Sequence, residues 1–207
     1  MQQSQVHNSL DSDIQLFTQL LGDVLRKHSR KRVLVMVERL REGFLELRRQ
    51  EDPELRSKLI ERIEGLDPQT LGEVIRAFNI YFALVNIAEE VNGHLTRREQ
   101  VSVGEPLWVG SFDHTVRDFQ EQGVAPEHFQ SLLEHLLYLP VFTAHPTESK
   151  RRTILENHRR IFLLLQALHG HKMNREEQDD KLREIATRIQ VLWKTDEVRV
   201  QLPHRPR

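Results

Sequence analysis

The feature that most limits the fold is the spacing of apolar residues through the first hundred positions. They recur every three or four residues, which is the period of an α-helix and not of a strand. Two Asp-Pro pairs, Asp52-Pro53 and Asp67-Pro68, interrupt the pattern. Each pair combines an N-cap acceptor with a residue suited to the first helical turn. The pattern therefore predicts consecutive helices over residues 14–25, 31–50, 53–64 and 68–91.

The rest of the chain continues the helical pattern with two interruptions. Asn92–Gly110 is polar and contains glycine and proline, so we expect a loop. Leu139–Thr143 favours extended structure, and Pro140 disfavours helix at the residue before it, so we expect a short buried strand. Asp11 or Ser12 is expected to cap the first helix. Further helices are predicted over residues 111–122, 126–137, 146–169 and 176–200.

Composition narrows the functions that need consideration. The 207 residues include 30 Lys and Arg against 31 Asp and Glu, a net charge of -1, so no overall field attracts nucleic acid or acidic membrane. The absence of cysteine excludes disulfides, thiolate nucleophiles and cysteine-bound zinc. The N-terminus lacks the pattern of a secretory signal, and no apolar run approaches the roughly 20 residues of a membrane span. We expect a cytoplasmic protein without nucleic-acid or membrane partners.

The junction Val141–Arg152 is the strongest candidate for chemistry. His145 lies between the predicted strand and the predicted helix, where α/β enzymes place reacting groups, and its imidazole can exchange a proton near neutral pH. Thr147 can cap the first helical turn, whose free N–H groups attract anions. Arg151 and Arg152 add positive charge. Together these groups suit a phosphate or a carboxylate.

A structural interpretation of the same junction stays open at this point. A histidine before proline is commonly a loop residue, and paired arginines on a helix commonly face water. The remaining histidines give weaker signals. His158, His169 and His171 have no carboxylate at a recognisable ligand spacing, so we interpret them as part of a solvated helix end. The residues themselves predict no metal site in this chain.

Three segments together carry a resemblance to a known family. They are Leu84-Val-Asn-Ile-Ala-Glu-Glu90, then Val141-Phe-Thr-Ala-His-Pro-Thr-Glu148 followed by Arg151-Arg152-Thr153, then Trp193-Lys-Thr-Asp-Glu-Val-Arg199. In this order they resemble signature segments of the phosphoenolpyruvate carboxylases. The resemblance covers nearly the whole chain and is weakest before Pro68.

The resemblance implies a fold larger than this chain. Members of the family are several times longer and form a parallel β-barrel surrounded by many helices. We therefore expect a mostly α chain, with helices plus one short strand, that is an incomplete piece of an α/β-barrel enzyme with extensive extra helices. Residues 1–138 would be an N-terminal helical region. Residues 139–207 would hold the first barrel strand, the loop with the catalytic histidine and the helices that follow.

The resemblance also implies an activity. Family members join phosphoenolpyruvate and bicarbonate to give oxaloacetate and phosphate with Mg²⁺ or Mn²⁺, a carbon dioxide fixation that replenishes the tricarboxylic acid cycle. By resemblance, His145 takes the carboxyl proton of carboxyphosphate, and Arg151 and Arg152 bind phosphate. The ligands of the metal lie further along the family's chain, so the isolated 207 residues are expected to be inactive. The full-length enzymes are commonly homotetramers.

Other interpretations place the chain in different classes. It could be a histidine phosphotransfer module with His145 as the acceptor, although Pro146 directly after the histidine favours a strand-to-helix junction. It could also be a non-enzymatic helical interaction protein. The tail Leu202–Arg207 departs from the family pattern, and a shift of one nucleotide can restore part of that pattern. We therefore expect a frameshift or a sequence error there, which the downstream nucleotide sequence would test.

Overall fold

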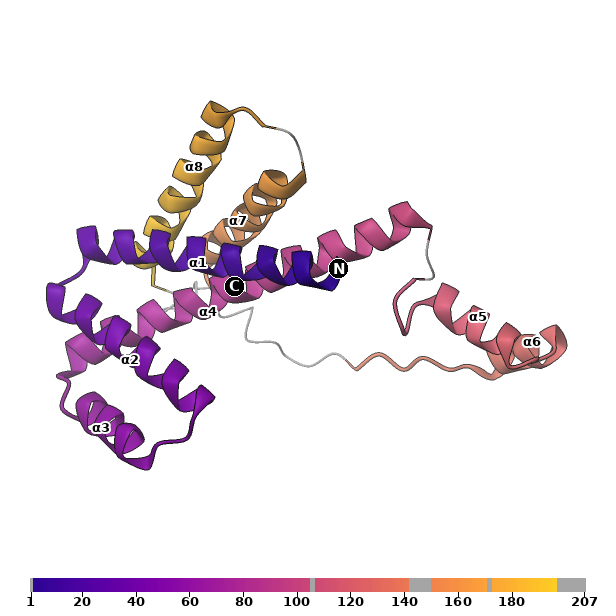
Figure 1. Cartoon of the computed structure of the whole chain (residues 1–207), viewed down its shortest axis with the longest axis horizontal. Helices are drawn as coiled ribbons and strands as arrows, with labels where there is room; N and C mark the ends of the chain where they lie inside the picture. Colours follow the sequence, from indigo (N-terminus) through magenta and orange to yellow (C-terminus); the bar gives the residue numbers. More distant parts are fainter. Residues whose placement is uncertain (1, 105–106, 142–149, 171–172, 197–207) are drawn as a thin grey trace, which may run out of the picture. The chain divides into compact units, whose positions relative to one another are not determined.

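The computed structural model describes residues 2–104, 107–141, 150–170 and 173–196, with side chains from residue 10 onward. Helices account for most of these residues, and no strand element occurs among them, which confirms the mostly α class (Figure 1). The helices are α1 (Gln2–His28), α2 (Lys31–Arg49), α3 (Pro53–Glu64), α4 (Pro68–Val103), α5 (Phe112–Glu121), α6 (Pro126–His135), α7 (Arg152–Gly170) and α8 (Arg175–Lys194).

Contacts divide the chain into two units. The first unit comprises residues 1–91 and 149–207, and the second comprises residues 92–148. The long helix α4 belongs to both, because its residues up to Val91 lie in the first unit and the remainder in the second. The boundary that the sequence predicts after residue 138 concerns the organisation of a longer enzyme and stays a prediction.

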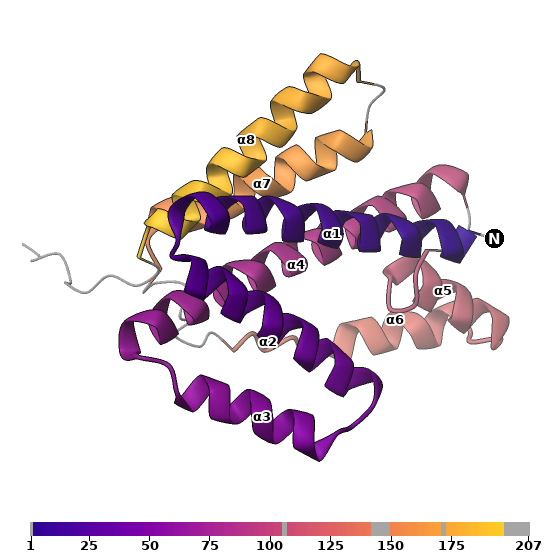
Figure 2. The ribbon, with the colours of Figure 1, turned by 60° about the vertical axis from the view of Figure 1, so that its left-hand side comes forward.

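The first unit is a helical assembly with an apolar core. Helix α7 packs against α8, α1 against both α8 and α2, and α2 against α3 (Figures 1 and 2). In α1, α2, α4, α7 and α8, residues at helical spacing point inward, as the sequence pattern predicts, whereas α3 buries only Leu59. The most deeply buried large side chains are Phe17, Leu25, Val33, Leu59, Leu84, Val91, Ile161, Leu165, Ile185 and Ile189.

The two Asp-Pro pairs begin helices, as predicted. The Asp52 carboxylate accepts hydrogen bonds from the N–H groups of Glu54 (2.9 Å) and Leu55 (3.1 Å) at the start of α3. At the start of α4, Asp67 accepts from both the N–H (2.9 Å) and the hydroxyl (2.7 Å) of Thr70. These hydrogen bonds lower the pKa of Asp67 because they stabilise its ionised form. Each cap satisfies N–H groups that have no partner within the helix.

The loop predicted over Asn92–Gly110 is wrong in its first part. Helix α4 continues to Val103 and is 36 residues long. Gly93 does not end it, because a single glycine in a helix costs only about 1 kcal/mol relative to alanine, and Leu95 and the four residues from Arg97 to Gln100 are good helix formers. The helix stops at Gly104, whose φ of 75° requires the left-handed region that glycine adopts most easily.

The short strand predicted at Leu139–Thr143 is not observed over its described part, Leu139–Val141. These residues lie outside helices and strands, and Phe142 and Thr143 lie outside the described residues. The physical reason is that a strand is defined by its hydrogen bonds to a neighbouring strand, and β propensity alone cannot supply that neighbour.

Several predicted helix ends also differ from the structure. Helix α1 begins at Gln2, so neither Asp11 nor Ser12 caps it, because both lie inside a longer helix. Helix α8 begins one residue earlier than predicted, at Arg175. There Asn174 and Glu177 form reciprocal hydrogen bonds of 2.9 and 3.0 Å, a capping box. Helix α8 ends at Lys194 and not near Val200.

Helix α4 is also apolar enough to be compared with a membrane span. Its most apolar stretch of 18 residues has a mean hydropathy of 1.3, and by length and composition alone such a helix could cross a membrane. A core helix meets the same criterion, and Val74, Ala77 and Leu84 of α4 are buried within the first unit. The expectation of no membrane partner stays a prediction.

Candidate active-site region

The cationic junction before α7 is described from Lys150 onward. His145 and Thr147 lie outside the described residues, so their roles stay predictions. Lys150 precedes the helix, and Arg152 is the first helical residue. The helix predicted from Pro146 therefore does not continue unbroken into α7.

Arg151 occupies the N-cap position of α7. Its carbonyl accepts hydrogen bonds from the N–H groups of Ile154 (2.9 Å) and Leu155 (3.4 Å) in the first turn of the helix. Ile154 is also the first residue of α7 that is buried. The helix thus begins where its apolar side first packs, and not at the proline that marks a helix start in the sequence.

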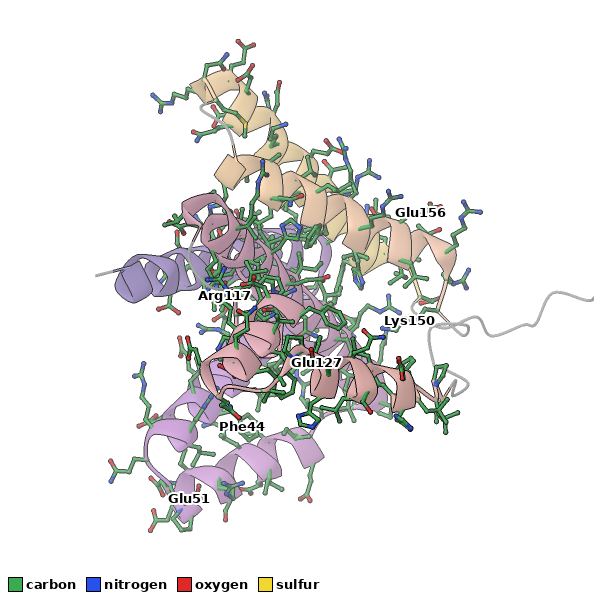
Figure 3. All side chains as sticks on the ribbon, turned by 90° about the vertical axis from the view of Figure 1, so that its right-hand side faces the viewer. Phe44, Glu51, Arg117, Glu127, Lys150 and Glu156 are labelled. Atoms are coloured by element: carbon green, nitrogen blue, oxygen red, sulfur yellow. The ribbon has the colours of Figure 1, made fainter. Side chains whose placement is uncertain are left out.

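Arg152 is the more exposed of the two predicted phosphate-binding arginines. Its side chain is 85% exposed, and its Nε donates a hydrogen bond to the Glu156 carboxylate one turn later (2.6 Å). Figure 3 shows Glu156 at the edge of α7, with Lys150 labelled below it. An anion that binds Arg152 must therefore compete with Glu156.

Arg151 is the less exposed of the two arginines. Its Nε is buried and has no hydrogen-bond partner among the described residues. A buried donor without an acceptor costs about 1–3 kcal/mol, and more for a charged group. A phosphate or carboxylate oxygen at this position would remove that cost. Of the two predicted phosphate-binding arginines, Arg151 is therefore the stronger candidate.

A small cavity of about 60 Å³ lies inside the first unit beside this junction. Helices α4, α7 and α8 contribute to its wall, together with Lys150 from the junction and Thr195 after α8. Three of its polar side chains carry or can carry a positive charge. The lining residues are Arg76, Asn79, Ile80, Ala83, Lys150, Ile154, His158, Leu192 and Thr195.

Arg76 is the residue of this region that sequence reasoning missed. Its guanidinium donates to the Trp193 carbonyl (3.2 Å) and to the Asp196 carboxylate (2.6 Å). It thereby joins α4 to the end of α8. A single arginine on an apolar helix gives no sequence signal of a partner 120 positions away.

The Trp193–Asp196 part of the third segment has a structural role here. Trp193 is buried, and its Nε1 donates to the carbonyl of His28 at the end of α1 (3.4 Å). Asp196 accepts from Arg76 on α4. This segment thus connects α8 to α1 and α4 and fixes the position at which the chain leaves α8.

The segment Leu84–Glu90 divides between core and surface. Leu84, Ile87 and Ala88 are buried, whereas Glu89 and Glu90 are exposed. The apolar members therefore hold α4 in the first unit. The two carboxylates project from the opposite side of the helix, where no described residue pairs with them.

His169 does not belong to a solvated helix end, which corrects the sequence interpretation. Its Nε2 lies 2.8 Å from Oδ2 of Asp13, and the side chain of Asp13 is only 7% exposed. The hydrogen bond to Asp13 raises the pKa of His169, against the smaller effect of burial. This pair joins α1 to α7.

The described residues contain no group of three or more His, Asp or Glu side chains that could hold a metal ion. They therefore offer no cluster of three protein ligands for the Mg²⁺ or Mn²⁺ that the family resemblance implies.

Fold and site together define a class of protein: a mostly helical chain whose described residues include a cationic junction at the start of α7. The chain belongs to the phosphoenolpyruvate carboxylase family, whose sequence profile matches residues 10–206.

Individual relatives agree with this assignment. The chain is 39% identical over 202 residues to a phosphoenolpyruvate carboxylase of Roseiflexus castenholzii, 34% over 197 residues to one of Thermus thermophilus and 31% over 200 residues to one of Corynebacterium efficiens. Each match covers 94% of this chain but only 21–22% of the relative. The chain therefore spans about a fifth of the length of these curated relatives.

Proposed function

We propose that this chain forms part of the active site of a phosphoenolpyruvate carboxylase, which converts phosphoenolpyruvate and bicarbonate to oxaloacetate and phosphate. The family match over residues 10–206 carries the proposal. Because the chain corresponds to about a fifth of its relatives, the remaining machinery would lie in the other four fifths. The isolated chain is then inactive. The complete enzyme would be a cytoplasmic homotetramer.

The proposed reaction assigns roles to three residues. A bicarbonate oxygen attacks phosphorus, which forms carboxyphosphate and releases the enolate of pyruvate. His145 takes the carboxyl proton of carboxyphosphate, which then separates into CO₂ and phosphate, and the enolate carbon attacks CO₂. Arg151, and more weakly Arg152, compensates the charge of the phosphate. A bound Mg²⁺ or Mn²⁺ would supply further charge compensation.

The structure of Arg151 supports its part in this proposal. Its buried Nε lacks an acceptor among the described residues, and Lys150, the preceding residue in the sequence, lines the small cavity. Positive charge at the start of a helix strengthens the attraction for a phosphate, because the unpaired N–H groups of the first turn point the same way.

Reconstitution tests the proposal. The purified chain is assayed for oxaloacetate with phosphoenolpyruvate, bicarbonate, Mg²⁺, malate dehydrogenase and NADH, alone and mixed with the part of the Roseiflexus castenholzii relative that this chain does not match. We expect no NADH oxidation by the chain alone and activity in the mixture. His145→Gln should lower that activity about 10²-fold or more, as loss of a general base does. His128→Gln, on α6, is the control.

The relative's own matching segment provides the positive control. If that segment restores activity and this chain does not, the proposed function is wrong. Oxaloacetate formation by the isolated chain would contradict the expected inactivity and would place a complete site within the 207 residues.

A further inference from the structure

The turn between α1 and α2 carries a dense cluster of positive charge. Residues 26–32, here the basic turn, read Arg26-Lys-His-Ser-Arg-Lys-Arg32, with five cations and no acid, and no other seven consecutive residues of the chain hold as many cations. The chain as a whole has a net charge of -1, so this charge is local. None of the three signature segments includes the basic turn. A cluster of this kind is typical of a site for anions.

Part of the charge stabilises the end of α1. Basic residues in a last helical turn offset the negative end of the helix dipole, and Arg26, Lys27 and His28 are the last three residues of α1. Arg26 also forms an ion pair with Asp23. This role accounts for the cations that belong to α1. It does not account for those that follow.

The cations after α1 are opposed to the helix that they begin. Helix α2 starts at Lys31, between Arg30 and Arg32, and its first turn contains no acidic residue. The N-terminal end of a helix dipole is positive, so cations there are repelled by it. The side chain of Arg30 provides no cap, and no described group accepts a hydrogen bond from the N–H of Lys31 or Arg32. A bound anion would accept from these donors and compensate the charge.

Two lysines of the basic turn are available to a ligand. Carboxylates near the start of α4 pair with Arg30 and Arg32, at N–O distances of 2.7 and 3.5 Å. Lys27 and Lys31, in contrast, are exposed and form no ion pair among the described residues. These two ammonium groups can therefore bind an anion without breaking a contact of the fold.

A hollow of about 780 Å³ in the first unit adjoins the basic turn, since Lys27 to Arg30 form part of its wall. Figures 1 and 2 show that the end of α1, the start of α2 and the end of α8 lie together. The volume is of the size that accommodates a small molecule. The charged residues of the lining are Lys27, Arg30, Arg76 and Lys194, with Glu73 as the single carboxylate, which gives a formal charge of +3. Of these cations, Arg76 is already paired, as described above.

The chemistry of the basic turn selects the kind of ligand. The turn has no apolar side chain that could enter a membrane, and the one ring that lines the hollow, that of Trp193, is buried and not free to stack on a nucleic-acid base. Several cations within one turn match negative charges that lie close together. We propose that the basic turn and the hollow bind a small molecule with two or more adjacent phosphate groups. The site uses none of His145, Arg151 and Arg152 and does not depend on the proposed function.

Isothermal titration calorimetry of the 207-residue chain tests the proposal. Tripolyphosphate, ATP without Mg²⁺ and inorganic phosphate are titrated separately at the same ionic strength. We expect one site per chain that binds tripolyphosphate about tenfold or more tightly than inorganic phosphate, because adjacent phosphates accept more charge-assisted hydrogen bonds. Binding of tripolyphosphate but not ATP would support a site for inorganic phosphates, and binding of ATP would extend it to nucleotides. No binding of either, or equally tight binding of inorganic phosphate as an adventitious ion only, overturns the proposal.

Substitutions locate the site. Lys27→Gln/Lys31→Gln should weaken the binding of the phosphate compound about tenfold or more, as the loss of charge-assisted hydrogen bonds does. Arg48→Gln/Arg49→Gln, at the other end of α2, is the control, because it removes the same charge and should leave binding unchanged. Equal weakening by both double substitutions would show attraction to the overall charge alone, and the proposal would be wrong.

Lys31→Gln separates the loss of a ligand contact from the loss of the fold. Because Lys31 opposes the dipole of α2, its replacement should weaken binding while the unfolding temperature stays equal or rises. Thermal unfolding of the ligand-free chain measures this. Unchanged binding, or weaker binding together with a lower unfolding temperature, contradicts the role that we propose for Lys31.

Discussion

His169 on α7 lies with its Nε2 2.8 Å from Oδ2 and 3.0 Å from Oδ1 of Asp13 on α1, across 156 positions of sequence. Because this contact raises the pKa of His169, its stabilisation is fully present below the ordinary histidine value near 6.5 and declines as the pH rises through the raised value.

The pair makes the stability of the first unit depend on pH. His169→Gln should lower the free energy of unfolding by about 1.5–3 kcal/mol at pH 5.5, the usual range for a hydrogen bond to a charged group, and by less at pH 9. Urea unfolding at both pH values measures this. His128→Gln is the control, and an equal loss at the two pH values would contradict the argument.

The Arg76 contacts should stabilise the end of α8. Arg76→Met removes the hydrogen bonds to Asp196 and to the Trp193 carbonyl. Because both partners of the ion pair are partly exposed, we expect a loss of only about 1 kcal/mol. Quenching of Trp193 fluorescence by acrylamide, in a Trp108→Phe background, should increase. Arg62→Met on α3 is the control: it also removes one positive charge and should leave the quenching of Trp193 unchanged.

A matched pair of glycines tests the close approach of α2 and α3. A Cβ at Gly43 would lie 2.8 Å from both Cδ atoms of the buried Leu59, whereas one at Gly72 in α4 would meet nothing within 4 Å. Gly43→Ala should therefore destabilise the chain by roughly 1–3 kcal/mol. Gly72→Ala should stabilise it by about 0.5–1 kcal/mol through helix propensity. Thermal unfolding measures both, and equal effects would contradict the predicted clash.

Glu184 makes stability sensitive to strong acid. The hydrogen bond from Arg160 on α7, at 2.7 Å, is the main cause that lowers the pKa of Glu184 to about 2. Its stabilisation is present above pH 4.5 and is lost as the pH falls through about 2. Glu184→Gln should cost up to about 1 kcal/mol at pH 7, since the pair is partly exposed, and nothing at pH 1.5. Glu46→Gln on α2 is the control in the same urea titrations.

Arg151 and Arg152 should differ in the reconstituted enzyme. Arg151→Gln should lower kcat/KM for phosphoenolpyruvate at least tenfold, because Arg151 has a buried donor without a described acceptor. Arg152→Gln should have a smaller effect, because Arg152 is exposed and already paired with Glu156. Steady-state kinetics measure both effects. A larger fall in kcat/KM for Arg152→Gln than for Arg151→Gln would contradict the prediction that Arg151 is the main phosphate-binding arginine.

The sequence predicted features that depend on neighbouring residues. Asp52 and Asp67 begin helices because a carboxylate before proline satisfies nearby N–H groups whatever surrounds it. The end of α4 was harder to predict, because Gly93 resembles a stop signal and only the helix around it shows that the penalty is tolerated. The strand at Leu139–Val141 could not form from propensity alone, because its hydrogen-bond partner is not among the described residues.

The amino-acid sequence by itself determined the helical class, two helix starts, the core-facing stripes and membership of the phosphoenolpyruvate carboxylase family. These depend on local hydrogen bonds, apolar spacing and residue identity. Only the tertiary structure placed Arg76 against Asp196 and Asp13 against His169, and only it showed that no apolar side chain is buried among the described residues of the second unit. Such relationships join residues more than a hundred positions apart or depend on the exposure of a whole surface, and no local pattern encodes either.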